Sequence, residues 1–320
     1  MNKAKIIARE AEMAELKRCY ESDRSELVIV YGRRRVGKTF LVDTFFDKKY
    51  DFTYVGGHKL TKAKQLRGFA KALKKAAGMK LQPKFASWED AFDALEEYIE
   101  SLPQEKRKVI FIDEMPWIDT PQSEFVEAFE AFWNGWGARR TDIMLIASGS
   151  ASSWMMDKLV DNPGGLHGRI TNNIYIRPFT LKETREFLHQ SGFTWPDINI
   201  LQTYMALGGI PYYLGMLNKD QSLTDNIDAL FFSGEKPLTK EYSRLYKSIF
   251  KESEKYEAVI KALSSNKKGY TRKELAEKLK VENNGHFGNI LEDLVNCDFI
   301  REYNTISKKV RTNSSIYQLV

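Results

Sequence analysis

The sequence predicts an α/β protein with a parallel sheet, and three observations support this. Short apolar runs alternate with helical stretches through the first half of the chain, which is typical of a parallel sheet covered by helices. The runs at 109–112 and 143–147 are apolar throughout, as expected of strands buried on both faces. After residue 178 the strand-like runs stop and helical patterns take over. We therefore expect a sheet domain first and helical parts after it.

Five strands are expected, at 27–31, 52–55, 109–112, 143–147 and 173–176, with helices at 39–46, 62–77 and 88–101. In the second helix Leu66, Phe69 and Leu73 follow the spacing of one buried face. Between Lys59 and Lys80 there are eight Lys and Arg and no Asp or Glu. This run is expected to be the solvated face of the amphipathic helix, and attraction of a polyanion is the alternative.

The composition is that of an ordinary folded protein. The chain has 320 residues, of which 42% are hydrophobic and 29% charged, with a net charge of +6. The sequence has no apolar run long enough for a membrane helix, and its N-terminus lacks the apolar stretch of a secretory signal. Cys19 and Cys297 lie far apart without metal-ligand spacing, so no zinc site or disulfide framework is expected. A cytoplasmic location follows as the expectation.

A glycine-rich segment joins the first strand to the first helix of the sheet. Residues 32–39 fit the pattern G-x-x-x-x-G-K-[ST]. In such a loop the backbone N–H groups and the positive end of the following helix dipole face the phosphates of a nucleotide. We expect ATP with Mg²⁺, with Lys38 on the β- and γ-phosphates and the Thr39 hydroxyl on the metal. The expected nucleotide contacts are Gly32, Arg33, Arg34, Arg35, Val36, Gly37, Lys38, Thr39 and Phe40.

Acidic and hydroxyl side chains follow two of the buried strands. Asp113 and Glu114 come directly after the run at 109–112, at the carboxyl edge of the sheet where ligands of such folds bind. Asp113 is expected to hold Mg²⁺, and Glu114 to polarise the attacking water. Ser148 follows the run at 143–147 and is a candidate for contact with the γ-phosphate or the water. A plain turn at Ser148-Gly149-Ser150 is the alternative.

Several motifs together resemble a known family. They are Ala8-Arg9-Glu10, the glycine-rich loop, VIFIDE at 109–114, LIASGS at 145–150, residues 165–169, Arg177-Pro178-Phe179 and Gly208-Gly209-Ile210-Pro211. In content and order they resemble the archaeal-type ATPases of the STAND class, within the AAA+ group. The resemblance covers the whole chain.

The resemblance implies an ASCE P-loop sheet of order 5-1-4-3-2, a helical lid and a C-terminal winged helix. The corresponding parts are an ATPase core at 1–178, a lid and linker at 179–245, with the linker near Gly234 and Pro237, and a winged helix domain at 246–320. Arg9 would lie near the adenine, and Pro211 belongs to the element that packs the lid on the base. Arg169 stands where AAA+ relatives carry an arginine finger, with a structural ion pair as the alternative. No nuclease activity is expected, because no D…(D/E)-x-K constellation occurs near the end of the chain.

The last part of the chain itself predicts a winged helix-turn-helix. Helices are expected at 257–263, 272–281 and 285–297, with Thr271 and Glu274 as a capping box, and β-like runs at 299–303 and 315–320. Duplex DNA could dock on the third helix and on a wing with Lys308, Lys309 and Arg311. Acidic residues on that helix favour a packing or protein-interaction module as the alternative.

The leading functional hypothesis is an ATPase that acts as a nucleotide-dependent switch and couples its ATP state to the winged helix. Its partners would be ATP and ADP, with duplex DNA, a protein partner or further copies of the chain as additional candidates and no membrane. One alternative is a DNA-binding regulator with an ATP-sensing, weakly hydrolytic domain. Another is an AAA+-style motor, which would need a ring of subunits.

Overall fold

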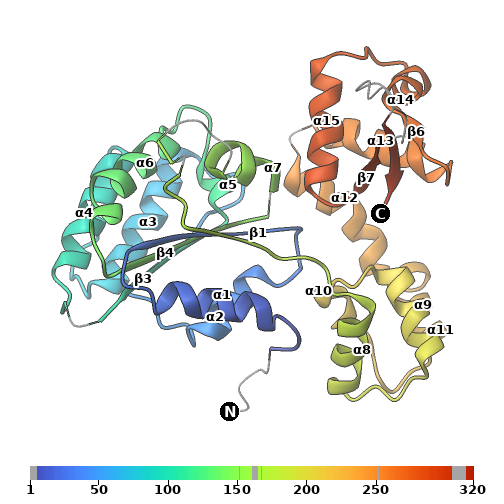
Figure 1. Ribbon diagram of the computed structural model, residues 1–320, viewed down its shortest axis with the longest axis horizontal. Coiled ribbons are helices and arrows are strands. Elements are labelled where there is room, and N and C mark those ends of the chain that lie inside the picture. The colour runs from blue at the N-terminus through green and yellow to red at the C-terminus, as the bar shows by residue number, and fades with distance from the viewer. Residues whose placement is uncertain are drawn as a thin grey trace. The chain divides into compact units, whose positions relative to one another are not determined.

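The computed structural model describes residues 6–104, 106–150, 152–160, 165, 166, 168–250, 252–304 and 315–320. The chain divides into two compact units, Met1–Met216 and Leu217–Val320. Figure 1 shows a sheet with helices in the first unit, and a smaller unit of helices with a short sheet at the C-terminus. The three-part division expected from the sequence stays a prediction.

A five-stranded parallel sheet forms the centre of the first unit. Its strands are β1 (Glu26–Tyr31), β2 (Phe52–Val55), β3 (Lys108–Asp113), β4 (Ile143–Gly149) and β5 (Asn172–Tyr175). Their order is β2-β3-β4-β1-β5, and each neighbouring pair is parallel. The five expected strands and the order 5-1-4-3-2 are therefore confirmed, and every strand end lies within two residues of the expected one. The central strands β3 and β4 are buried along their whole length, which explains why their sequences are apolar without alternation.

Successive residues of the strands face opposite sides of the sheet, and each side has its own core. Leu27, Ile29 and Ile112 belong to the core on one side, whereas Val28, Val30 and Phe111 belong to the other. Helices α3, α4 and α6 lie on the first side and α1 and α2 on the second (Figure 1). This two-sided cover fixes the sheet firmly, so its carboxyl edge is a rigid platform for side chains.

The helices of the first unit follow the strands closely. They are α1 (Glu10–Tyr20), α2 (Lys38–Phe45), α3 (Lys62–Ala76), α4 (Trp88–Glu100), α5 (Met115–Ile118), α6 (Phe125–Gly135), η1 (Gly137–Arg139), α7 (Ser152–Met155) and the π-turn η2 (Met156–Val160). The three helices expected in this region are confirmed. Helix α4 begins with a capping box of Ser87 and Asp90, which satisfies backbone N–H groups that the helix itself leaves without partners.

Three helices complete the first unit after the last strand. They are α8 (Leu181–Gln190), α9 (Asp197–Leu207) and α10 (Pro211–Leu214). Gly209 has a φ of 67°, and a Cβ there would lie 2.2 Å from the carbonyl oxygen of Phe179. The Phe179 N–H also donates to the Gly209 carbonyl at 2.8 Å. Glycine is required because the segment before α10 passes directly against the chain that leaves β5.

The C-terminal unit is built from helices and a three-stranded antiparallel sheet. Its elements are α11 (Leu223–Ile227), the π-turn η3 (Asp228–Phe232), α12 (Pro237–Ile249), α13 (Ser253–Ser264), β6 (Tyr270–Thr271), α14 (Arg272–Leu279), α15 (Gly285–Asn296), β7 (Ile300–Tyr303) and β8 (Ile316–Leu319). The strand order is β6-β8-β7. The three expected helices and two expected strands are present, and the capping box of Thr271 and Glu274 is confirmed.

Two local features of this unit differ from the expectation. We expected a polar linker around Pro237, but Pro237 begins helix α12. Proline is favoured in the first turn of a helix, where its missing N–H costs no hydrogen bond, so the residue that suggested a break is a start. The short strand β6 was not expected, because its two residues also read as the approach to a helix cap. Lys308, Lys309 and Arg311 lie outside the described residues.

Within the described part of the chain, no helix is both long enough and apolar enough to cross a membrane.

Candidate nucleotide site

The loop at 32–37 joins β1 to α2 and needs glycine at both ends. Gly32 has a φ of 143°, and a Cβ there would lie 2.2 Å from the carbonyl oxygen of Ile176, just beyond β5. Gly37 has a φ of 95° and is the N-cap of α2. Arg35 also has a positive φ, of 71°. These conformations turn the chain tightly at the N-terminal end of α2, where N–H groups and the helix dipole favour an anion.

The side chain of Lys38 lies inside this loop. The residue is buried, and its Nζ donates to the carbonyl oxygens of Gly32 at 2.9 Å and Arg33 at 3.1 Å. The first residue of α2 thus places an ammonium group at the concave side of the loop. A cation at this point adds to the positive end of the helix dipole.

At the carboxylate of Asp113, the ends of strands β3 and β4 meet the start of helix α2. Thr39 Oγ1, in the first turn of α2, donates to Asp113 Oδ2 at 2.7 Å. Ser148 at the end of β4 donates to Asp113 Oδ1, and so does the Glu114 N–H at 2.9 Å. Asp113 is only 3% exposed, so these donors replace the water that a charged carboxylate would otherwise bind. The structure therefore brings together Thr39, Asp113 and Ser148, which the sequence placed on separate elements.

Glu114 directs its carboxylate to the end of β4. Its Oε2 accepts from the hydroxyl of Ser150 at 2.8 Å and from the Ser150 N–H at 3.3 Å. Burial raises the pKa of Glu114, and the nearby positive charge of Lys38 opposes this increase. Its φ of 52° lies in the left-handed region, which side-chain-bearing residues seldom adopt. The turn from β3 into α5 thus holds Glu114 in an uncommon backbone conformation, and the pKa of the same residue is raised.

The three arginines of the loop differ in their surroundings. The Arg35 guanidinium lies 4.0 Å from the ring centre of Tyr212 in α10. The Arg34 guanidinium lies 5.7 Å from the ring of Trp117 in α5, and Arg33 is half-buried. Cation–π contacts of this kind are worth about 0.5–1 kcal/mol at exposed sites. The loop is therefore in contact both with the element that follows β3 and with α10.

A pocket of about 110 Å³ lies beside the loop, and the two residues expected near the base, Arg9 and Pro211, both line it. It is lined by Ile6, Ile7, Arg9, Val36, Gly37, Phe40, Leu41, Phe179, Phe187 and Pro211. Arg9 donates to the carbonyl oxygens of Val36 at 3.3 Å and Arg177 at 2.6 Å, and its guanidinium lies 4.9 Å from the Phe179 ring centre. Phe40 and Pro211 line the pocket as well. An apolar hollow with one fixed guanidinium suits a flat heterocycle.

Arg169 is not brought to this site by any contact that the structure describes. The residue is exposed, and its backbone N–H donates to the Leu166 carbonyl at 2.9 Å. Among the described residues its side chain makes no hydrogen bond or ion pair. His167, in the same motif, lies outside the described residues.

Two residues of the site region were not predicted from the sequence. Ser150 contacts Glu114, although the sequence favoured Ser148, which contacts Asp113 instead. Gln65 in α3 is fully buried and bonds both to Gly57 after β2 and to the Trp117 carbonyl in α5 at 2.7 Å. An amide in an otherwise apolar row of α3 was the indication that could have revealed it. Gln65 holds α5, which follows Glu114, against the end of β2.

The oxygens around Asp113 fit a magnesium ion better than a transition metal. No group of three or more His, Cys, Asp or Glu is gathered for metal binding among the described residues. Mg²⁺ bound with a nucleotide needs no such group, because it keeps several waters and takes one or two protein oxygens besides the phosphates. The Thr39 hydroxyl and the Asp113 carboxylate, 2.7 Å apart, are oxygen donors of that kind.

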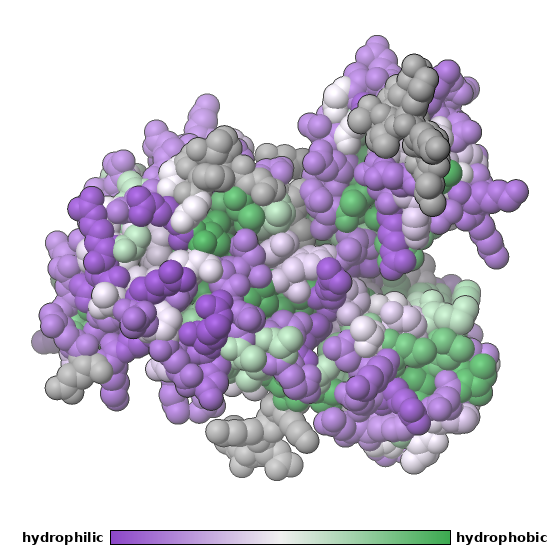
Figure 2. Space-filling model, viewed as in Figure 1, coloured by the Kyte–Doolittle hydropathy of each residue, from purple (hydrophilic) through white to green (hydrophobic). Residues whose placement is uncertain are grey.

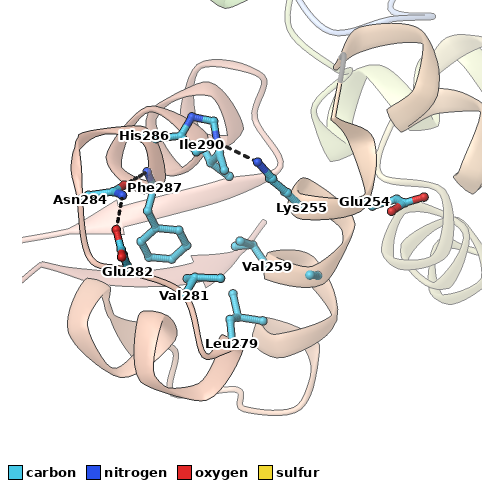
Figure 3. A pocket seen from close by; sticks show the side chains of 11 residues that line it. Glu254, Lys255, Val259, Leu279, Val281, Glu282, Asn284, His286, Phe287 and Ile290 are labelled. Carbon is cyan, nitrogen blue, oxygen red and sulfur yellow. Dashed lines mark hydrogen bonds between the residues drawn. The ribbon is translucent and has the colours of Figure 1, made fainter.

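A second hollow, of about 480 Å³, lies in the C-terminal unit (Figure 3). Its apolar lining includes Val259 of α13, Val281 after α14 and Phe287 of α15. At its rim Lys255 Nζ and His286 Nε2 are 3.2 Å apart. The hollow is larger than the pocket beside the glycine-rich loop, but it holds no convergence of carboxylates or hydroxyls comparable to that around Asp113.

The sheet order and the loop that leads from β1 into α2 are those of a P-loop ATPase core, and the first unit has this fold. The chain belongs to the family of ATPase domains found predominantly in Archaea, whose sequence pattern matches residues 6–217. This confirms the archaeal-type ATPase resemblance. Placement in the STAND class stays a prediction.

The chain is also similar to a further archaeal protein and to two solved structures. An uncharacterized protein of Methanocaldococcus jannaschii, MJECL04, is 25% identical over 98% of this chain, and the chain spans 66% of that relative's length. The Walker-type ATPase PABY2304 of Pyrococcus abyssi is similar with a TM-score of 0.68 and 18% identity, over 98% of this chain and 93% of that one. The ORC2 protein of Aeropyrum pernix is similar with a TM-score of 0.59 and 15% identity, over 99% and 90% of the two chains. At these identities the two structures show a shared fold.

Proposed function

We propose that the chain binds ATP with Mg²⁺, hydrolyses it, and uses the change in nucleotide to switch the conformation of its helical parts. The observation that carries the proposal is the convergence on Asp113. Thr39 and Ser148 both donate hydrogen bonds to this buried carboxylate. Lys38 and Glu114 lie at the same carboxyl edge of the sheet. These are the residue types that nucleoside triphosphate hydrolysis requires, gathered from strands β3 and β4, from the residue after β3 and from helix α2.

The phosphates would occupy the N-terminal end of α2. Lys38 would exchange its two loop carbonyls for the β- and γ-phosphate oxygens, which offer the same ammonium a full negative charge. Thr39 and Asp113 would hold Mg²⁺, and Ser148 would keep the Asp113 carboxylate oriented. When bound, the ion neutralises the charge that develops on the transferred phosphoryl group.

Glu114 is proposed as the base that orients and polarises the attacking water. A base works best when its pKa lies close to the pH at which the enzyme operates. Burial moves the pKa of Glu114 upward, in that direction. Ser150 holds the carboxylate through its hydroxyl at 2.8 Å, so Ser150 is proposed as a positioning residue.

The base of the nucleotide is proposed to enter the pocket that Arg9, Phe40 and Pro211 line. Pro211 begins α10, and the next residue, Tyr212, contacts Arg35 of the loop. Movement of the loop on phosphate binding would therefore change the contact with α10. This is the physical basis that we propose for a switch in the first unit.

The C-terminal unit is proposed to be a winged helix whose function depends on the nucleotide state. Its order α13, β6, α14, α15, β7, β8 provides three helices and an antiparallel sheet of three strands. His286, in the first turn of α15, lies 3.4 Å from Glu252 and contacts Lys255. Contact of α15 with duplex DNA stays a prediction, as does an arginine-finger role for Arg169.

The test compares two variants of the site with the unaltered protein. Glu114→Gln is expected to bind ATP normally and to hydrolyse it about 10²–10⁴-fold more slowly, because the water loses its base. Lys38→Ala is expected to lose ATP binding. Binding is measured by the rise in melting temperature with ATP and Mg²⁺, and turnover by phosphate release.

Glu21→Gln is the matched control, since it removes an exposed carboxylate at the end of α1. Unchanged hydrolysis by Glu114→Gln would remove Glu114 from the mechanism. Unchanged ATP binding by Lys38→Ala would show that the loop at 32–37 does not bind the phosphates as proposed. The same assays with duplex DNA at several salt concentrations test the DNA-binding hypothesis, because phosphate contacts weaken steeply as salt rises.

A further inference from the structure

Two neighbouring helices of the first unit carry charges of opposite sign. Helix α3 has basic side chains and no acidic one, and α4 has acidic side chains and no basic one. On α3 the basic row is Lys64, Arg67, Lys71, Lys74 and Lys75, and on α4 the acidic row is Glu89, Asp93, Glu96, Glu97 and Glu100. Figure 2 shows a mostly hydrophilic surface on the lobe that carries these helices.

Few of these charges are balanced within the chain. Glu100 accepts from Trp136 and lies 3.7 Å from Arg140. The other members of the two rows make no ion pair and no side-chain hydrogen bond with a described residue. The acidic row also repels itself: burial raises the pKa of Glu96, and the neighbouring charges of Glu100 and Asp93 raise it further. An ordinary solvated helix face carries both positive and negative side chains, whereas here each helix carries charges of one sign only.

The two helices run side by side in the same direction. Phe69 of α3 packs its ring against Trp88 and Phe92 of α4, with ring centres 5.6 and 5.8 Å apart. Further along, the Tyr98 hydroxyl of α4 donates to the Ala76 carbonyl at 3.0 Å, across a sequence separation of 22 residues. Residues of α3 are therefore level with residues of α4 about 22 positions later.

The same separation relates the charges of the two rows. It pairs Arg67 with Glu89, Lys71 with Asp93, Lys74 with Glu96 and Lys75 with Glu97. Both rows turn away from the sheet, because the opposite face of each helix is buried in the core. Opposite charges are thus level along the helices, yet among the described residues these level pairs form no ion pair within one copy.

We propose that this α3–α4 surface joins two copies of the chain in a symmetric dimer. A two-fold axis parallel to the helices would place α3 of each copy on α4 of the other, without a shift along the helix direction. Each level pair would then meet its complement in the second copy, and would do so twice by symmetry. The basic and acidic rows each extend about 16 Å, so they match in length. A polyanion is a poorer fit, because it would meet the acidic row beside the basic one.

The test reverses charges on one helix at a time. The α3 variant carries Arg67→Glu, Lys71→Glu and Lys75→Glu, and the α4 variant carries Glu89→Lys, Asp93→Lys and Glu97→Lys. Each alone places like charges at three of the four level pairs and is expected to be a monomer by light scattering. The two variants mixed are expected to form a heterodimer. A chain with all six changes should dimerise again by itself.

Salt and a matched variant serve as controls. The dimer dissociation constant is expected to rise about tenfold or more between about 0.05 and 0.5 M salt, since exposed ion pairs are screened. A control variant carries Lys261→Glu, Lys267→Glu and Lys268→Glu on the C-terminal unit. It changes the net charge by as much as the α3 variant does, and the mass of the dimer should stay the same. Melting curves and ATP binding confirm folding of each variant, independently of hydrolysis.

Three results would overturn the proposal. The unaltered protein could remain a monomer at low salt, or the mixture of reversed variants could fail to associate. The α3 variant could also lose affinity for duplex DNA while the mass of the protein stays the same, which would make the basic row a nucleic-acid surface instead.

Discussion

Removal of the Ser150 hydroxyl tests how the environment of Glu114 is tuned. Ser150→Ala deletes the 2.8 Å hydrogen bond to Glu114 Oε2 and keeps the longer one from the backbone N–H at 3.3 Å. A hydrogen bond to a charged group contributes about 1.5–3 kcal/mol, and 1.36 kcal/mol corresponds to one pKa unit. The hydrogen bond from Ser150 stabilises the ionised form of Glu114, so its removal favours the protonated form. The pKa of Glu114, which burial already raises, should therefore rise further.

The assay is the pH dependence of kcat for ATP hydrolysis. Glu114 must be ionised to act as a base, so activity falls as pH drops through its pKa. In Ser150→Ala the acid limb should move by about one to two units to higher pH, while the plateau at high pH changes by a factor of a few. Ser150→Thr keeps the hydroxyl and should restore the limb. Ser264→Ala removes an exposed hydroxyl in the C-terminal unit and should have no effect.

An acid limb that stays in place in Ser150→Ala would refute the reasoning. It would mean either that Glu114 is not the titrating group or that the Ser150 hydroxyl does not hold it in the active form. A fall in the plateau without a shift would assign Ser150 to orientation of the water and not to the charge of Glu114.

Two further predictions concern stability. Gly209→Ala should lower the free energy of unfolding by more than Gly208→Ala, because both residues have positive φ but only the Cβ at Gly209 meets the Phe179 carbonyl oxygen. Backbone strain alone costs about 1–3 kcal/mol, and urea unfolding of both variants would detect the difference; equal losses would contradict it. Burial would raise the pKa of Asp142, but hydrogen bonds such as that from Arg140 outweigh this and lower it to about 2. Its contribution, about 2 kcal/mol, should be complete above pH ~4 and lost as pH falls through the folded pKa, and Asp142→Asn should remove this part of the pH dependence.

The fold was predictable because its elements are marked locally. Strands such as β3 and β4 contain unbroken apolar runs, at 109–112 and 143–147, and the glycines at 32 and 37 mark a turn that few other residues can adopt. The sheet order came from the family resemblance, because pairing between distant strands leaves no local trace. Helix α12 was missed since Pro237 suits a turn and a helix start equally well.

The candidate site was predictable as a set of residue types but not as a set of contacts. The sequence placed Asp113 and Glu114 together, yet their carboxylates take different partners, Ser148 and Ser150. Which serine faces which carboxylate depends on the twist of β4 as it ends, and a three-residue motif does not encode that. Gln65 was missed for a similar reason. A buried amide is recognised only when its partners at Gly57 and Trp117, from two other elements, are seen.

The left-handed backbone of Glu114 has a consequence for how this protein can evolve. At a position with a φ of 52°, glycine or asparagine would fit with less strain than a glutamate. Burial disfavours the ionised form of Glu114, which adds to the free-energy cost of a glutamate at this position. Selection for heat resistance alone would tend to replace this residue, so its retention under such selection would measure how strongly the organism needs the chemistry that we propose for it.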